Sequence, residues 1–391
     1  MSISFQTVPF IESGLGKISI LPDLCKRFNI KKPIIVTDKG LFDLGLVEKV
    51  EQSLKKDRID VCIYKDVLAD PPESNIFDAV KLYNDFGADG VIGFGGGSSM
   101  DVAKAVSYFS INKISISDCY GVNKLINSRS PLIQIPTTAG TGSELTPIAI
   151  FTLESEQKMG IVDPLLYADC AILDADLTID LPTNITAYSG IDAMVHAIQA
   201  YTTKIKKNPI SDSLAKKALS LLGSNLRIVV SDPKNRVARE NMLLGSMLAG
   251  MAFANAPCAA VHALAYPIGA KFHVPHGLSN SLVLSKVLQF NSIKAEEMYC
   301  EIAVDCLPQL AGKKITIDDF IIGIEELITD LKIPKTLSEV GIKHNDIPQL
   351  AEDAMKQERL LINNPRELNL SDAKSIYEAV SYTHLTLPTK A

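Results

Sequence analysis

The sequence of 391 residues has no basic block. Its 39 lysines and arginines are outnumbered by 45 aspartates and glutamates, which gives a formal net charge of −6. Surfaces that bind nucleic acid carry clustered positive charge, so we expect no nucleic acid partner. Low-complexity tracts and internal repeats are also missing, and the 47% apolar and 21% charged residues are typical of an ordinary globular protein.

Two further absences bear on the compartment. The seven cysteines are odd in number, scattered, and never spaced as a C-x-x-C pair, which fits reduced thiols better than a disulfide framework. The first residues, MSISFQTVPF, lack a basic region followed by an apolar run, so we expect no export signal. We therefore expect a cytoplasmic protein, and as a separate expectation we predict a homo-oligomer.

One apolar segment is long enough to be mistaken for a membrane span. It runs from Gly245 to Ala270, but it contains Asn255, Pro257 and His262 and is rich in alanine and glycine. Polar residues are costly in a bilayer, and small residues favour close helix packing inside a protein. We expect no membrane association.

The chain is long for a single hydrophobic core, and its pattern changes near residue 183. Before that point, short apolar runs such as KPIIVTD, DVCIYKDV and CAILDADL alternate with helical segments such as FDAVKLYNDFG. This alternation predicts an α/β, Rossmann-like domain with a parallel sheet over residues 1–183. From about Asn184 the 3.6-residue period dominates, which predicts an all-α domain over residues 184–391.

Four glycines lie within five residues, between an apolar strand and a helix expected to begin near Ser98. A tight strand-to-helix turn needs only one or two glycines, so the excess favours a loop in which a phosphate approaches the backbone. The pattern differs from the standard dinucleotide fingerprint, because the candidate acid, Asp38, lies upstream at the end of the KPIIVTD strand. The four glycines are Gly93, Gly95, Gly96 and Gly97.

Asp38 has two interpretations. Its carboxylate could accept hydrogen bonds from both hydroxyls of an adenosine ribose and repel a 2′-phosphate, which would favour NAD over NADP. It could equally cap the helix that begins in KGLFDLG. A second polar loop, PTTAGTGSE, follows a later strand of the same half and strengthens a dinucleotide site; it supplies Thr137, Thr138 and Thr141.

Two polar residues interrupt the apolar helix GIDAMVHAIQAYTT. Asp192 and His196 are one turn apart and share a helical face, where both are costly unless something compensates them. His262, His273 and His276 follow within fifteen residues of one another. One carboxylate and several imidazoles suit Fe²⁺, Zn²⁺ or Mn²⁺. A hydrogen bond in a neutral core would explain the Asp192–His196 pair, but not the whole pattern.

Four motifs carry most of these residues: GGGSSMDVAK, IPTTAGTGSE, GIDAMVHAIQAY and FHVPHGLSN. In this order and spacing the motifs resemble those of the iron-containing, or group III, alcohol dehydrogenases over nearly the whole chain. Together the four motifs are highly specific for this family. A similar fold alone would not determine the function.

The resemblance implies that Asp192, His196, His262 and His276 bind one divalent metal, Fe²⁺ or Zn²⁺, between the two domains. It also implies that NAD(P) is bound by Gly95, Gly96, Gly97, Ser98, Thr137, Thr138 and Thr141. Lys158 matches a lysine that the family uses near the nicotinamide ribose, and Asp38 matches the position that selects NAD. Asp70 matches a position where relatives often carry asparagine.

Two features depart from the family. Many relatives carry a histidine, assigned to proton relay, where this chain has Tyr266, so we expect the relay to use Tyr266, His273, water or the cofactor ribose. Family members also continue as a helix at their end, so we interpret residues 381–391 (SYTHLTLPTKA) as an unstructured, non-native tail and discount His384.

We expect His276 to be the ligand and His273 not. Pro275 fixes φ just before His276, and Gly277 frees the backbone just after it, which would aim that side chain inward. His273 has no such flanking residues. It is expected in the substrate pocket as a relay, with a supporting or surface position as the alternative.

The function we predict is metal-dependent hydride transfer between NAD(H) and a small alcohol, aldehyde or ketone. A dehydroquinate synthase-like lyase is one alternative, but it needs clustered basic residues, and Met242–Asn280 holds only Lys271 besides histidine. A non-catalytic nucleotide-binding redox sensor is another, and it would not need four converging metal ligands. The sequence leaves the substrate open.

Overall fold

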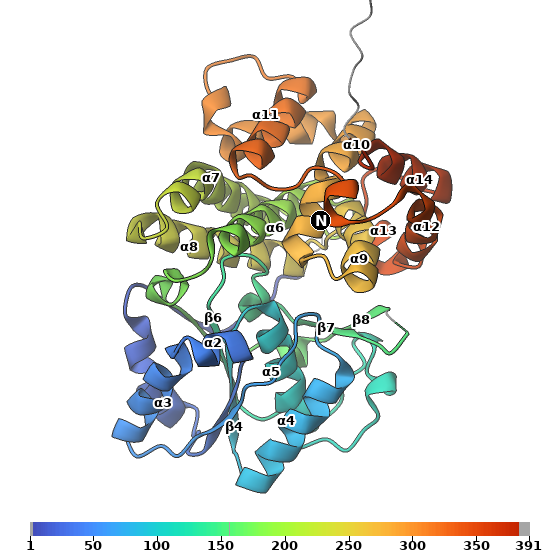
Figure 1. The fold of residues 1–391 in the computed structure, drawn as a ribbon. Helices are drawn as coiled ribbons and strands as arrows, with labels where there is room; N and C mark the ends of the chain where they lie inside the picture. Colours follow the sequence, from blue (N-terminus) through green and yellow to red (C-terminus); the bar gives the residue numbers. More distant parts are fainter. Residues whose placement is uncertain (1–2, 156, 383–391) are drawn as a thin grey trace, which may run out of the picture.

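The computed structural model describes residues 3–155 and 157–382, and Figure 1 shows the course of the chain. Short runs rich in valine and isoleucine form the strands, as their preference for a pleated, buried surface leads one to expect. The strands are β1 (Phe10–Ser13), β2 (Pro33–Val36), β3 (Cys62–Tyr64), β4 (Gly90–Gly95), β5 (Gly121–Val122), β6 (Leu132–Pro136), β7 (Ile148–Thr152), β8 (Lys158–Val162) and β9 (Cys170–Leu173).

Six of these strands form one sheet in the order β1-β9-β6-β4-β2-β3, and every neighbouring pair is parallel. Alternate side chains point to opposite faces. Ile35 packs with α1 (Leu21–Arg27) and α3 (Leu46–Lys56), whereas its neighbour Ile34 packs with α4 (Glu73–Phe86) and α5 (Gly97–Phe109). The predicted parallel sheet wound with helices is therefore confirmed.

A second, three-stranded sheet was not predicted. β7 and β8 form an antiparallel hairpin, and the short β5 adds beside β8. The segment KMGIV does not stand out as a strand, because Gly160 interrupts its apolar residues. This hairpin matters for the site because it pairs Lys158, a predicted cofactor residue, with Thr152. In Figure 1 the hairpin lies on the side of the first half that faces the helices.

Helices make up most of the described chain after residue 182, and Figure 1 shows them stacked over the sheet. α6 begins at Thr183, so the change of structure coincides with the expected boundary at residue 183, which itself stays a prediction. Besides the short α2 (Lys39–Asp43), the helices are α6 (Thr183–Thr202), α7 (Pro209–Ser231), α8 (Arg236–Asn255), α9 (Ala260–Phe272), α10 (His276–Cys306), α11 (Ile317–Asp330), α12 (Ile347–Met355), α13 (Glu358–Leu361) and α14 (Leu370–Ala379).

The expected tail falls almost wholly outside this description. Ser381 and Tyr382 follow α14, and the remaining residues of SYTHLTLPTKA, His384 among them, lie outside the described residues.

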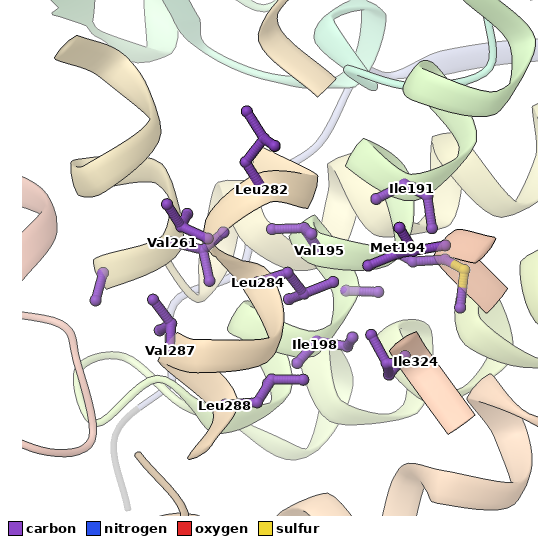
Figure 2. Packing of buried hydrophobic residues seen from close by; sticks show 14 of the residues in the cluster. Ile191, Met194, Val195, Ile198, Val261, Leu282, Leu284, Val287, Leu288 and Ile324 are labelled. Carbon is purple, nitrogen blue, oxygen red and sulfur yellow. The ribbon is translucent and has the colours of Figure 1, made fainter. Parts of the chain in front are cut away.

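The core of the helical half forms around α6, which is buried on nearly all sides. Figure 2 shows Val195 and Ile198 of α6 packed near Leu284 and Leu288 of α10, with Ile324 of α11 beside them. Each such side chain contributes on the order of 1.5–3 kcal/mol by leaving water. The packing fixes the rotation of α6, and with it the direction in which its few polar side chains point.

No single helix of the described chain is long and apolar enough to cross a membrane. Together α8 and α9 pass the same test of length and composition, but they meet at an angle of 108°. The apolar segment Gly245–Ala270 spans this bent pair, and most of its residues are buried.

α10 begins so close to α6 that no side chain fits at Gly277. A Cβ atom there would lie 2.1 Å from the carbonyl oxygen of Tyr188. Pro275 is the residue that precedes the helix, and His276 is its first residue. The expectation that Gly277 frees the backbone after His276 is therefore corrected: Gly277 is helical, and its small size permits the close approach of two helices.

Gly277→Ala is expected to destabilise the protein by about 1–3 kcal/mol, because the added methyl group must push α10 away from α6. Thermal unfolding measures the effect. Gly269→Ala in α9 is the matched control, since a Cβ there would be 3.4 Å from its nearest atoms and alanine favours the helix. Equal melting temperatures for the two variants would contradict the steric argument.

Candidate active site

A cavity of about 210 Å³ lies where the sheet domain meets the helices. Residues of both halves line it. Those from the first half include Asp70, Gly97, Ser98, Asp101, Thr141 and Lys158. Those from the second half include His196, Phe253, His262, Tyr266, His276 and Arg359.

Four predicted metal ligands meet at this cavity. Asp192 and His196 come from α6, His262 from α9 and His276 from the start of α10, and one ligand atom of each lies within 4.8 Å of all the others. Nε2 of His276 is 3.6 Å and Nε2 of His262 is 3.9 Å from Oδ1 of Asp192. A set of one carboxylate and three imidazoles within this radius has the chemistry that a divalent cation requires.

Burial determines the protonation of this cluster. It lowers the pKa of His196, with Asp192 opposing the fall, and it lowers the pKa of His262 further because His196 and His276 add to the effect. Both rings are therefore neutral at pH 7 and have lone pairs to offer. The Asp192 carboxylate, which is 2% exposed, therefore gains no positive charge from His196 or His262, and a cation in this position would compensate it.

The backbone orients His196. Its Nδ1 lies 3.3 Å from the carbonyl oxygen of Gly140 and donates to it, which leaves Nε2 free as an acceptor or ligand. The ring also stacks on Phe253, with 4.3 Å between the ring centroids. Gly140 belongs to the PTTAGTGSE loop, so the first half of the chain positions a ligand of the second.

Gln199, which the sequence analysis missed, orients His262. The backbone N–H of Ala259 donates to Oε1 of Gln199, so the amide turns its Nε2 towards Nδ1 of His262, 2.9 Å away. The ring proton is then on Nε2, which faces Nε2 of His196 at 2.9 Å. For Nε2 of His262 to bind a metal, the proton must move to Nδ1 and Gln199 must present an oxygen instead.

Asn280 is a second residue that the sequence analysis did not single out. Its Nδ2 lies 2.6 Å from Oδ1 of Asp192, and 3.3 Å and 3.4 Å from Nε2 of His276 and His262. The amide thus points between the ligands and donates to the carboxylate. The available signal was its place four residues after His276, which puts both side chains on one face of α10.

Packing within the protein explains three of the four loop glycines. Gly95 has φ +150°, and a Cβ at Gly93 or Gly97 would lie 2.0 Å from Gln134 or 2.8 Å from Thr141. At Gly96, by contrast, the nearest atoms would be 3.7 Å away. The protein therefore leaves space only in front of Gly96, immediately before α5, where a helix N-terminus favours a phosphate.

The other predicted cofactor residues gather around this loop. The N–H of Thr137 donates to the carbonyl oxygen of Gly95, and Thr138 lies against Gly96. Asp38 follows β2, which pairs with β4, so it is at the same edge of the sheet. Its Oδ1 accepts from the N–H of Leu41 and caps α2, which confirms the capping interpretation, while its role in choosing NAD stays a prediction.

Lys158 and Asp70 form an ion pair at the cavity, with 2.6 Å between Nζ and Oδ1. The Lys158 ammonium also lies 5.6 Å from the ring centroid of Tyr266. Burial raises the pKa of Tyr266 to about 12, so its hydroxyl keeps its proton at neutral pH. Lys158, Asp70 and Tyr266 are thus brought together, as a group, beside the four metal-ligand candidates.

His273 is not part of this group. It ends α9 in the left-handed conformation, with φ +54°, its side chain is exposed, and it does not line the cavity. The structure thus does not place His273 in the substrate pocket, and the surface position that was its alternative describes it.

Comparison with known proteins identifies the family. The model of the family described as iron-containing alcohol dehydrogenase matches residues 9–175, and that of the Fe-containing alcohol dehydrogenase family, C-terminal, matches residues 186–381. The chain belongs to the iron-containing alcohol dehydrogenases. These findings favour neither the lyase nor the redox sensor.

Individual relatives cover the whole length. The chain is 36% identical to long-chain-alcohol dehydrogenase 1 of Geobacillus thermodenitrificans, over 98% of each chain. Its structure is similar to that of a 1,3-propanediol oxidoreductase, with a TM-score of 0.93, 32% identity and coverage of 97% and 100%. It is also similar to sulfoacetaldehyde reductase of Bifidobacterium kashiwanohense in complex with NAD⁺, with a TM-score of 0.88, 27% identity and coverage of 98% and 100%.

Gln199→Leu is expected to weaken binding of Fe²⁺ or Zn²⁺ by about 10- to 100-fold, because Nδ1 of His262 loses its partner. Competition with a chelator measures the affinity. Gln199→Glu is the matched variant: its carboxylate accepts from both Ala259 N–H and His262 Nδ1–H, so it should bind metal at least as tightly as wild type. Equal weakening in both variants would show that Gln199 only fills space.

Proposed function

We propose that this family member is an NAD-dependent dehydrogenase that uses Fe²⁺ or Zn²⁺ to interconvert a small alcohol and its aldehyde or ketone. The observation that carries the proposal is the convergence of Asp192, His196, His262 and His276 on a cavity that the glycine loop also borders. An NAD⁺-bound relative of the same fold supports the choice of cofactor.

Asp192, His196, His262 and His276 would hold the metal. The bound ion would polarise the substrate oxygen as a Lewis acid and ease loss of the alcohol proton. The chain's own contribution is to keep His196 and His262 neutral by burial and to fix their rings through Gly140 and Gln199.

Asp38, the glycine loop and Lys158 would hold NAD, which would supply the hydride chemistry. Gly96 and the N-terminus of α5 leave room for its diphosphate. Thr137, Thr138, Thr141 and Ser98 surround that position, and the first two are held against the loop. The Lys158–Asp70 pair would then face the nicotinamide ribose.

Tyr266 would take part in the relay of the alcohol proton. Its ring borders the cavity near Lys158 and His276, and its high pKa keeps the hydroxyl as a hydrogen-bond donor rather than a phenolate. The phenol would pass a proton only through its hydrogen bonds, together with water or the cofactor ribose. Phe253 and Ile150 on the cavity wall would exclude bulk water.

We further propose a cytoplasmic, homo-oligomeric protein without a nucleic acid or membrane partner. The state of the cysteines supports the compartment, because all seven are unpaired and none forms a disulfide.

His276→Ala is expected to lose bound metal and dehydrogenase activity together, because the variant removes one of four ligands. Metal analysis of the purified protein and NADH formation with a short alcohol test this. His273→Ala is the matched control and should keep the metal, since His273 is exposed and outside the cavity. Metal lost in His273→Ala but kept in His276→Ala would reverse the assignment.

Asp38→Gly is expected to relax the preference for NAD over NADP, since it removes the carboxylate that would repel a 2′-phosphate. The ratio of kcat/KM for the two cofactors measures the preference. Because Asp38 also caps α2, Asp38→Asn serves as the control: it keeps a capping oxygen but loses the charge, and it should relax the preference as well. Equal use of both cofactors by the wild type would contradict this role.

A further inference from the structure

Charged side chains on the cavity wall are almost all paired. Histidines apart, the acidic and basic side chains that line the cavity are those of Asp70, Asp101, Lys158 and Arg359. Asp70 and Lys158 form their 2.6 Å ion pair. Both oxygens of Asp101 are also satisfied: Oδ1 accepts from Ser143 Oγ at 2.6 Å and Oδ2 from the N–H of Ile150 at 2.9 Å.

Arg359 is different. Within residues 3–155 and 157–382, its guanidinium takes part in no hydrogen bond or ion pair, although the side chain is only partly exposed. It comes from the short helix α13 and reaches β8, where Nη2 is 3.8 Å from the position that a Cβ would take at Gly160. Arg359 lines the cavity, and the five donors of its planar guanidinium have no acceptor among the residues that the structure describes.

The guanidinium is close enough to the reaction centre for its charge to matter there. Burial raises the pKa of Tyr266, and the Arg359 charge opposes that rise; burial and the neighbouring imidazoles lower the pKa of His262, and Arg359 adds to that fall. The same cavity is also lined by apolar residues, among them Pro71, Ile148, Phe253 and Leu360. Apolar side chains together with a cation that has no partner among the described residues are suited to bind a small molecule with one charged end.

We propose that Arg359 binds an anionic group of the substrate, a carboxylate or a sulfonate, at the end away from the reacting carbon. The enzyme would then act on oxo acids and the corresponding hydroxy acids in preference to neutral aldehydes and alcohols of the same length. This inference rests on the proposed function. The diphosphate of NAD is the other possible anion, but the glycine loop and α5 provide its place in the other half of the chain.

The guanidinium geometry sets the strength expected. Arginine binds a carboxylate through two parallel N–H···O bonds, and a charge-assisted contact of this kind corresponds to about a 10- to 100-fold difference in kcat/KM. Lysine in its place would keep the charge but lose the planar fork, so an intermediate preference is expected.

The experiment uses the metal-loaded full-length protein and pairs of aldehydes of equal length. Propanal, butanal and pentanal are compared with 3-oxopropanoate, 4-oxobutanoate and 5-oxopentanoate, and the quantity measured is the ratio of kcat/KM for the oxo acid to that for the neutral aldehyde. The wild type is expected to favour the oxo acid at one or more lengths. Arg359→Gln should lower that ratio about 10- to 100-fold, and Arg359→Lys should lower it less.

Lys356→Gln is the matched control. Lys356 lies three residues earlier at the end of α12, pairs with Asp353 at 2.7 Å and borders a neighbouring cavity but not this one. Losing its positive charge should leave the ratio as in wild type. If Lys356→Gln lowers the ratio as much as Arg359→Gln does, general charge attraction explains the preference and the proposal is wrong.

Three further outcomes would overturn the inference. A wild type without preference at every length shows that no anionic group is bound. An equal fall of kcat/KM for both members of a pair in Arg359→Gln shows that the residue only supports the fold. A raised KM for NAD⁺ with an unchanged ratio assigns Arg359 to the cofactor. Failure of the proposed function looks different, because then the wild type turns over none of the six aldehydes.

Discussion

The charge of Asp192 is the constraint on which the site depends. It is an almost fully buried carboxylate beside His196 and His262, which burial keeps neutral, and an uncompensated charge of this kind costs several kcal/mol. Asn280 supplies one hydrogen bond but no positive charge. A divalent ion resolves this imbalance, and the same ion is what the chemistry of an alcohol oxygen needs.

Meeting that constraint requires three helices to approach closely. α6 supplies two of the candidate ligands, and α9 and α10 supply one each. Gly277 lets α10 touch α6, and the apolar contacts in Figure 2 keep α6 from rotating. The loop after β6 then joins the two halves, because Gly140 orients His196 while Thr141 packs on Gly97 of the glycine loop. A metal ligand and the cofactor loop are therefore held by one short segment.

Features that depend on neighbouring residues could be predicted from the sequence, and contacts between residues far apart in the chain could not. The parallel sheet and the four ligands come from local patterns: alternating strands and helices, and Asp192 and His196 one turn apart. Contacts across long separations leave no such pattern. Gln199 contacts His262, which lies 63 residues later in the sequence. The hairpin of β7 and β8 was also missed, because its strands are short and a glycine interrupts one of them. His273 was misplaced because its neighbour His276 has the same composition around it, and only the end of α9 separates them.

For the same reason the reaction type is easier to predict from the sequence than the substrate. Most of the candidate metal and cofactor residues lie in short motifs, so the reaction type can be predicted from the sequence. The cavity wall that meets the rest of the substrate is built from single side chains on β7, β8, α8 and α13, and relatives are named for long-chain alcohols, 1,3-propanediol and sulfoacetaldehyde. A change of one wall residue alters what binds without disturbing Asp192 and its partners. One scaffold can therefore keep its hydride chemistry while its substrate changes, and the charge at Arg359 is the feature of this wall that distinguishes an acidic substrate from a neutral one.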